Sequence, residues 1–556
     1  MSTNYEKINT LRKESVEQRK AYLVGGGIGS LAAAAYLIRD GHVPGKNIYI
    51  LEKMKIFGGS MDGTGTAEEG YIVRGGRELE AHMECMWDLF ATIPSLTNPN
   101  KTVLDEVHEL NMQMPIKSIC RIIEEGKKAD FSSYGLNLDQ ITVLTKLVVS
   151  PDDLIGNKRI DEWFEASFFE TNFWCFWRTM FAFENWHSVL EVKRYMVRFM
   201  HLLPGMNQLI GILHTEYNQY DSMILPLQKW LEAQNVNLEP DCQVNDLDID
   251  INGDKISVTR IHYTKAGKRN EIDISKDDLV FVTNGSMTAN STYGTKSSPA
   301  VINRSMTDRD CWTLWEKIAK KHAGFGNPAI FANNIDQTKW LSFTATFRGS
   351  KFLDMVQKFT DNAPGTGGIV SFKKSNWLLS VVTHKQPHFI NQPEDVKVVW
   401  GYGLFPDKVG DFVKKPMADC SGMELLSEVC YQFGFEAELD SILKSVINCI
   451  PCMMPYITSQ FMPRSKGDRP DVVPVGSTNF AFLGQFTEIP GDCVFTVEYS
   501  IRSAMMAVYT LLDLDKEIIP VYAGQYDVRV LEKAAKALLG PYVTPIKQMA
   551  VGLLKN

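Results

Sequence analysis

At 556 residues the chain is too long for one compact core, so we expect two or three domains. Apolar residues make up 44%, an ordinary share for a globular protein, and a net charge of −8 without a strongly basic region disfavours nucleic acid as a partner. No apolar run is long enough to predict a spanning helix, and the polar first twenty residues lack the core of a secretory signal. Ten scattered cysteines suit a reducing, cytoplasmic setting.

Residues 21–52 carry the pattern of a dinucleotide-binding βαβ unit. The segment AYLVGGGIGSLAAAAYLIRDGH predicts a strand, a glycine turn and a helix, and NIYILEK predicts a second strand that ends at Glu52. Gly25 permits the tight turn and Gly27 the close approach of a pyrophosphate, while Ser30 stands where a third glycine is usual. Glu52 is expected to accept a hydrogen bond from a ribose hydroxyl.

Four later segments extend this prediction to FAD. FGGSMDG places a second Gly-Gly pair soon after the ribose acid, which is more typical of FAD proteins than of NAD dehydrogenases. The segment from 220 to 244 predicts a helix and then extended pieces, DLVFVTNGS a buried strand and glycine turn, and the segment from 479 to 512 a strand, a loop and a long helix. The predicted cofactor-binding residues are Gly25, Gly27, Gly29, Ser30, Glu52, Gly59, Ser60, Arg77, Val244 (beside adenine), Asn284, Gly285 and Gly484.

The predicted fold is therefore α/β, a discontinuous Rossmann-like FAD-binding domain with an inserted α+β substrate domain and a helical C-terminal tail. The tail mixes lysines with apolar residues, so we expect it either to pack as an ordinary terminal helix or to lie on a membrane surface. The predicted boundaries are 1–20 for a polar arm, 21–115, 220–300 and 475–520 for the FAD-binding domain, 116–219 and 301–474 for the substrate domain, and 521–556 for the tail.

Residues 160–203 are unusually rich in aromatic side chains. Eight Phe and Trp residues lie between Phe168 and Phe183, and they predict either a helical core or the lining of a pocket for a long apolar ligand. Cys449 and Cys452 form a CxxC pair without a second pair or nearby histidines. We therefore predict neither a redox site nor a metal site there.

The segment VRGGRELEAHMEC, residues 73–85, predicts a helix that begins directly after its Gly-Gly pair. Glu80 and Glu84 are expected to be solvated, because they lie off the apolar stripe. Glu78 stands at the predicted helix start, where free N–H groups and the helix dipole favour an ionised carboxylate. It is either a capping residue or a base ready for chemistry. The stripe consists of Leu79, Met83, Met86 and Phe90.

Seven segments together resemble one family, the oleate hydratases, also called the myosin-cross-reactive antigen family. The resemblance runs from about residue 20 to 535. It implies a FAD-dependent enzyme that adds water across the cis-9 double bond of oleic acid, and of linoleic acid, without net redox change. It also implies greater activity with reduced FAD and a homodimer. The segments are RDGHVPGKNIYILE, RGGRELEAHMECMWDLF, MFAFENWHS, YNQYDSM, DLVFVTNGS, HKQPHF and MPYITSQFMPRSKGDRP.

In that family a glutamate and a tyrosine are catalytic, and they match Glu78 and Tyr195. Hydration of an alkene needs a proton at one carbon and a hydroxyl at its neighbour, so an acid and a base must flank the bond. Glu78 suits the base, and Tyr195 suits the proton donor if Arg194 and Arg198 lower its pKa. The alternative interpretation is that Tyr195 only packs in the apolar stripe of its helix. Arg77 is expected to couple the flavin to the position of Glu78.

The resemblance also implies residues that bind the substrate. Gln219 matches a glutamine near the carboxylate or the pocket. Some members hold the carboxylate with a Thr-x-Asn pair before Arg-Gln-Pro-His-Phe, and this chain has Val382 and His384 there, followed by Lys385 and His388. We therefore expect the two histidines to set the register of the fatty acid.

Two other classes of protein fit parts of the sequence. A FAD-dependent oxidoreductase of the amine oxidase or desaturase type would use the same cofactor motif, although the single glycine-rich fingerprint disfavours a monooxygenase. A non-catalytic surface antigen is disfavoured by the lack of a signal sequence. The expected partner is an unsaturated long-chain free fatty acid, with contact between the protein and the inner face of the membrane.

Overall fold

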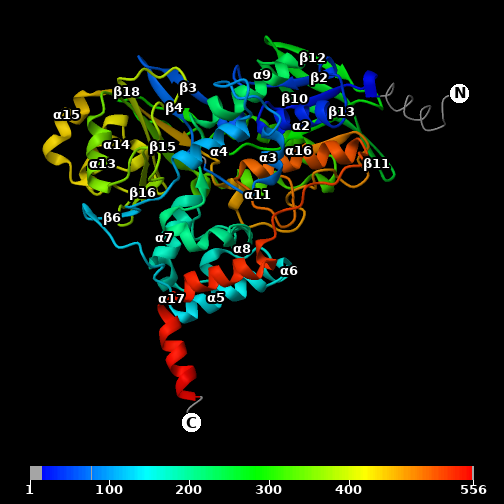
Figure 1. Cartoon of the computed structure of the whole chain (residues 1–556). Helices are drawn as coiled ribbons and strands as arrows, with labels where there is room; N and C mark the ends of the chain where they lie inside the picture. The colour runs from blue at the N-terminus through cyan, green and yellow to red at the C-terminus, as the bar shows by residue number, and fades with distance from the viewer. Residues whose placement is uncertain (1–15, 77, 554–556) are drawn as a thin grey trace.

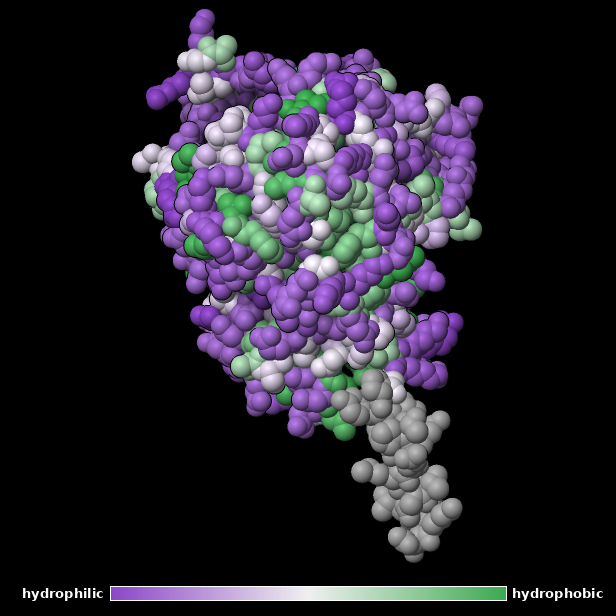
Figure 2. Space-filling view, turned by 90° about the vertical axis from the view of Figure 1, so that its left-hand side faces the viewer, coloured by the Kyte–Doolittle hydropathy of each residue, from purple (hydrophilic) through white to green (hydrophobic). Residues whose placement is uncertain are grey.

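The computed structural model describes residues 16–76 and 78–553, with side chains described as far as residue 540. Three parts are visible in Figure 1: a parallel sheet with its helices at the upper right, a second sheet with α13, α14 and α15 at the left, and a group of helices below them. The face shown in Figure 2, on the side of the second sheet, is mostly hydrophilic with apolar residues interspersed. Among the described helices, none combines the length and the apolar content needed to cross a bilayer.

A parallel sheet of five strands forms the first part and confirms the predicted α/β class. Four of its strands are short, mostly buried apolar runs, as parallel sheets require, and the edge strand at residues 237–239 is half-buried. One face packs against α2 (Ile28–Arg39), whose alanines allow close approach, and against α16 (Val497–Leu511). The strand order is β20 (Phe480–Leu483), β13 (Leu279–Thr283), β1 (Ala21–Val24), β2 (Ile48–Leu51) and β9 (Asn237–Glu239).

The other face of this sheet is covered by an antiparallel sheet and by one helix from a distant segment. The antiparallel sheet contains β10 (Cys242–Asn252), β11 (Lys255–Lys265) and β12 (Lys268–Asp273). Helix α10 (Cys311–Ala319) joins the same core through Leu314 and Ile318. Although α10 lies in the range assigned above to the substrate domain, it packs on the sheet that carries the cofactor motif.

The second part is an eight-stranded, mainly antiparallel sheet. Helices α13 (Lys351–Thr360) and α14 (Gly422–Phe433) cover one of its faces. The strand order is β14 (Thr292–Tyr293), β19 (Val446–Met454), β15 (Trp340–Arg348), β18 (Val396–Gly403), β17 (Leu379–Val382), β16 (Ile369–Phe372), β6 (Ile122–Glu124) and β7 (Lys127–Lys128).

The CxxC pair lies in β19 of this sheet. Cys449 packs into the core beneath α13 and α14, and Cys452 packs into a separate core on the other face. Both cysteines are buried free thiols. Because successive side chains of a strand alternate between faces, residues three apart point in opposite directions. The two thiols therefore share no site.

A hairpin joins the two sheets and leads into the candidate catalytic segment. It consists of β3 (Gly63–Thr66) and β4 (Gly70–Val73). The backbone N–H groups of Tyr71 and Val73 donate to the hydroxyls of Thr346 and Thr344 on β15, at 3.0 and 3.1 Å. These threonines thus fix where the chain leaves the hairpin.

Helices form the third part, below the two sheets in Figure 1. They are α5 (Leu138–Val149), α6 (Asp152–Ile155), α7 (Asn172–Phe181), α8 (Val189–Arg198) and α17 (Val528–Leu553). Both predictions for the aromatic segment, a helical core and the lining of a pocket, are confirmed in part. Trp174 and Trp177 are fully buried in the core, whereas Phe181 lines a cavity. Within the tail, the backbone of residues 528–553 forms one continuous helix, α17.

The segment after the Gly-Gly pair is not the predicted helix. Leu79–Glu80 form strand β5, which pairs with β8 (Ile212–Leu213), and helix α3 (Glu84–Phe90) begins later. The prediction that Glu80 is solvated is also wrong, because its side chain is only 1% exposed. It lies 3.0 Å from Arg198 and 3.1 Å from His201, so tertiary contacts override the helical pattern.

Ser30, at the third position of the fingerprint, generates a prediction about packing. Its fully buried hydroxyl lies 3.1 Å from the Thr283 hydroxyl, between α2 and β13. Ser30→Ala removes this bond, so we expect the free energy of unfolding to fall by about 1 kcal/mol. Ser30→Leu overpacks the same contact and should lower it by about 2 kcal/mol or more. Urea unfolding followed by circular dichroism measures both, and a Leu variant as stable as the Ala variant would contradict close packing here.

Candidate active site

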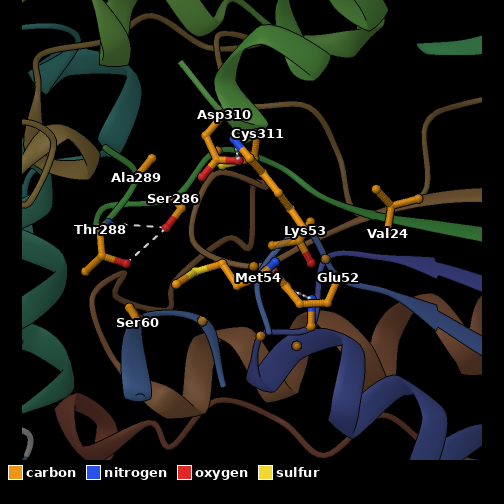
Figure 3. Close-up of a pocket in the computed structure, with 18 of the residues that line it drawn as sticks. Val24, Glu52, Lys53, Met54, Ser60, Ser286, Thr288, Ala289, Asp310 and Cys311 are labelled. Carbon is orange, nitrogen blue, oxygen red and sulfur yellow. Dashed lines mark hydrogen bonds and ion pairs between the residues drawn. The ribbon is translucent and has the colours of Figure 1, made fainter. Parts of the chain in front are cut away.

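A cleft of about 1080 Å³ opens at the carboxyl ends of β1 and β2. This is where open α/β sheets bind ligands. Glu52, Ser60, Ser286 and Asp310 surround it in Figure 3. Of the predicted cofactor-binding residues, the cleft brings together Gly25, Gly27, Gly29, Glu52, Gly59, Ser60, Val244, Gly285 and Gly484.

Two predicted cofactor residues, Ser30 and Asn284, are not in the lining of this cleft. Ser30 packs against Thr283, in the small-residue role that the fingerprint predicts for it. Asn284 follows β13 and is buried, and neither polar atom of its side chain has a hydrogen-bond partner among the described residues. Such an orphaned amide beside the cleft fits a polar group of a bound ligand. Arg77 lies outside the described residues.

The glycine turn leaves the start of α2 open to the cleft. Gly25 has φ +92°, which an L side chain rarely adopts. A Cβ on Gly59 would lie 3.0 Å from the Cα of Gly27, so the two turns touch through backbone alone. Gly27 caps α2 without a side-chain hydrogen bond, which leaves the first N–H groups of the helix available to a phosphate.

Glu52 is bound to its own turn. Its two carboxylate oxygens accept the N–H groups of Gly26, at 2.5 Å, and Met54, at 2.7 Å. Burial raises its pKa above the ordinary value despite these bonds. A carboxylate has more acceptor sites than these two bonds occupy, so a ribose hydroxyl can still donate to it.

The sequence reading missed Arg74 at this cleft. Arg74 is buried and lies 2.7 Å from Asp62, and its Nη2 donates to the Gly59 carbonyl at 2.6 Å. Its Nη1 donates to the Thr288 carbonyl at 3.1 Å. Arg74 stands directly before the Gly-Gly pair, which could have indicated a role at the turn, but the prediction named Arg77, after the pair. Arg74 thus ties the Gly59 turn and the loop at Thr288 to the segment that leads to Glu78.

An apolar chamber of about 900 Å³ lies beyond that segment. Tyr195 reaches it from α8, and its ring is packed against Phe181, with centroids 4.7 Å apart. Phe199 and Trp400 complete an aromatic wall. Glu78 also lines the chamber, at the point where the chain runs into β5.

A smaller polar chamber of about 410 Å³ adjoins the apolar one. It brings together the predicted residues Gln219, Val382, His384 and His388. Glu78 and Val382 line both chambers. The structure therefore places one carboxylate on the wall between a polar space and an apolar one.

Two of the histidines that line the polar chamber form a stacked pair. The rings of His384 and His388 lie 3.9 Å apart and are nearly parallel. Burial lowers the pKa of His384 to about 4, and that of His388 also falls, so both imidazoles are neutral near pH 7. Lys385 is ion-paired with Glu216. Any contact of these histidines with a fatty acid carboxylate is thus a hydrogen bond to a neutral ring.

The prediction that a helix start keeps Glu78 ionised is wrong. No helix begins there, and burial raises the pKa of Glu78 to about 7. Among the described residues, its Oε2 has no hydrogen-bond partner. A carboxyl group with a pKa near neutrality is well matched to general-base work, because both of its protonation states are accessible.

The prediction that two arginines lower the pKa of Tyr195 is also wrong. Burial raises this pKa well above its ordinary value. Arg194 lies 2.8 Å from Glu488 and Arg198 lies 3.0 Å from Glu80, so their charges are already paired. The Tyr195 hydroxyl donates to the carbonyl of Val494. Tyr195 is therefore a neutral phenol near pH 7, a weaker acid than an ordinary tyrosine, and its proton is directed at the Val494 carbonyl.

Comparison with known proteins gives matches of three kinds: a family model, curated relatives and solved structures. A model of the MCRA family matches residues 18–509. The chain is 41% identical over 544 residues to an oleate hydratase from Streptococcus pyogenes serotype M49 (strain NZ131), which covers 96% of this chain and 92% of that protein. It is 33% identical over 568 residues to a linoleate hydratase from Lactiplantibacillus plantarum, covering 93% and 98%. A solved oxidoreductase from Methanosarcina mazei gives a TM-score of 0.47 at 12% identity, covering 88% and 100%.

The raised pKa of Glu78 predicts a dependence of stability on pH. A carboxyl group whose pKa is raised to about 7 by folding stabilises the fold below its ordinary value of 4.5 and loses this contribution as pH rises towards 7. The side chain introduced by Glu78→Gln cannot ionise. The free energy of unfolding of this variant should therefore rise relative to that of the wild type between about pH 5 and about pH 8. Urea unfolding at both pH values measures the difference, with Glu165→Gln as an exposed control. An equal effect of Glu78→Gln at both values would contradict the raised pKa.

Proposed function

The chain belongs to the MCRA family, and on that premise we propose that it hydrates the cis-9 double bond of unsaturated fatty acids, converting oleic acid to 10-hydroxystearic acid and accepting linoleic acid. Its similarity to an oleate hydratase and a linoleate hydratase makes it a fatty acid hydratase, a hydro-lyase. The observation that supports the finer proposal is the position of Glu78 on the wall shared by the polar and apolar chambers.

Glu78 and Tyr195 divide the chemistry between them. Ionised Glu78 takes a proton from a water molecule in the polar chamber, and the resulting hydroxyl adds to carbon 10. The Tyr195 phenol delivers its proton to carbon 9 from the apolar chamber. The proton gained by Glu78 replaces the one lost by Tyr195, so the enzyme is restored and no electrons are transferred. The carboxylate and the faces of Phe181 and Phe199 stabilise the positive charge that develops on the alkene.

The two chambers also suit the two ends of the substrate. Each buried methylene contributes roughly 0.8 kcal/mol, so an eighteen-carbon chain gains on the order of 10 kcal/mol before the costs of binding. The aromatic chamber supplies this apolar surface. Gln219, His384 and His388 supply neutral hydrogen-bonding groups for the carboxylate, while Val382 offers none. Register along the chain is thus set by hydrogen bonds to neutral groups.

The residues of the large cleft fit FAD. The glycine turns and the open start of α2 suit the pyrophosphate, Glu52 suits a ribose, and the orphaned amide of Asn284 suits a further polar group. When bound and reduced, the flavin would supply negative charge. Arg74 lies four residues before Glu78, so the segment between them connects the cleft to the chambers. Greater activity with reduced FAD, a homodimer, a cytoplasmic location and contact with the membrane surface are part of the same proposal.

A labelling experiment tests the reaction. We expect the wild type with reduced FAD, incubated with oleic acid in oxygen-18 water, to give one labelled hydroxyl at carbon 10. Glu78→Gln and Tyr195→Phe should each lower kcat by about 100-fold or more, because each removes an acid or base from the transition state. Tyr134→Phe is the matched control, since Tyr134 is also buried and donates to a backbone carbonyl. Bleaching of bound oxidised FAD by the fatty acid, without hydroxy acid, would favour an oxidoreductase instead.

The pH profile of the reaction tests the roles separately. A base must be ionised, so kcat/KM should rise with pH through about 7, the pKa of Glu78, and then level off. Tyr195 should add no fall up to about pH 9, since burial holds its pKa well above 10.0. Initial rates between about pH 5 and about pH 9 give the profile. A flat profile from about pH 5 would show that Glu78 is not the titrating base.

A further inference from the structure

A buried ion pair lies directly beside the two proposed catalytic residues. Glu80 follows Glu78 by two positions, and Arg198 follows Tyr195 by three. Arg198 Nη1 lies 3.0 Å from Glu80 Oε1, and their side chains are 2% and 1% exposed. We propose that this pair is a positioning clamp that sets the spacing of Glu78 and Tyr195 across the apolar chamber. The proposal rests on the function proposed above and deepens it.

The periodicities of strand and helix make the clamp geometrically direct. Residues two apart in an extended chain share a face, and so do residues three apart on a helix. Glu78 and Glu80 therefore lie on one face of their segment, and Tyr195 and Arg198 lie on one face of α8. Glu80 and Arg198 form the ion pair. Glu78 and Tyr195 line the chamber. Glu80 itself lines that chamber.

Further contacts hold both partners of the clamp. Glu80 Oε2 lies 3.1 Å from His201 Nε2 and accepts the backbone N–H of His82 at 2.7 Å. Arg198 donates to the His82 carbonyl and lies 3.6 Å from Asp492. Glu80 is thus held by α8, by the 3₁₀ turn that follows α8 and by the backbone of its own segment. These partners lower its pKa, which keeps the carboxylate ionised.

The strand that carries Glu80 has little structure of its own to fix its position. β5 has two residues and pairs only with the two residues of β8. A Gly-Gly pair precedes it, and α3 begins four residues after it. Buried ion pairs add little net stability compared with apolar packing, since desolvation offsets their attraction. A charged pair at this site therefore acts through geometry, by holding a short strand to a helix.

Kinetics of matched variants test the clamp. Glu80→Gln removes the charge, and Glu80→Asp keeps the charge but shortens the side chain. We expect both to lower kcat by about 100-fold while KM stays within about threefold, because the reacting groups lose their spacing and not their chemistry. Glu191→Gln is the control. Glu191 is fully buried on α8, the helix that carries the clamp arginine, and lies 3.1 Å from Arg464 and from Arg469. It should keep kcat within about threefold.

Two kinetic outcomes would overturn the clamp. Near-wild-type kcat in Glu80→Asp would show that charge alone matters. Equal losses in Glu191→Gln and Glu80→Gln would show that any buried ion pair on α8 has the same effect. The first result would mean that Glu80 acts on the reaction through its charge. The second would mean that its ion pair only stabilises the fold.

Hydrogen exchange gives a readout that does not need activity. The clamp predicts faster exchange of the Leu79 and Glu80 amides in Glu80→Gln than in the wild type, and no change there in Glu191→Gln. Unchanged exchange in Glu80→Gln would overturn it. If the wild type makes no hydroxy acid at all, the proposed function fails, and exchange still decides whether the ion pair holds β5.

Discussion

The cost of burying a charge decides what each acidic side chain near the chambers does. Glu80 and Glu78 are two residues apart, and Glu80 is fully buried whereas Glu78 is half-buried. Glu80 has Arg198, His201 and a backbone N–H as partners, so its pKa falls and it stays ionised. Glu78 has no partner for its Oε2 among the described residues, so its pKa rises to about 7. One carboxylate becomes part of the scaffold, and the other becomes able to exchange a proton.

The segment that carries both carboxylates is held by all three parts of the molecule. The hydroxyls of Thr344 and Thr346 on the eight-stranded sheet fix its beginning. Arg198 of the helical part holds its middle. Glu498 of α16, beside the cofactor sheet, accepts the first N–H groups of α3 and fixes its end. The position of Glu78 therefore depends on all three parts of the molecule.

The aromatic segment shows that core and pocket are not exclusive uses of the same residues. Trp174 and Trp177 have no exposed surface and pack the helices together. Phe181, one turn further along α7, turns its ring to Tyr195 and the apolar chamber. The rigid core holds the lining rings in place, which suits a site that must position an alkene between two groups.

The sequence by itself determined the elements whose pattern is local. The glycine turn between β1 and α2, the small residue at Ser30 and the helix of Tyr195 follow from residue spacing, as does the α/β class. The tertiary structure alone decided that residues 79–80 form a strand, that Glu80 is buried, that Arg74 binds the glycine turn and that Tyr195 keeps its proton. These properties depend on partners and desolvation supplied by distant segments, as with Glu80 and His201, which are 121 residues apart. No local pattern carries that information, because a pKa is set by everything that surrounds the group in space.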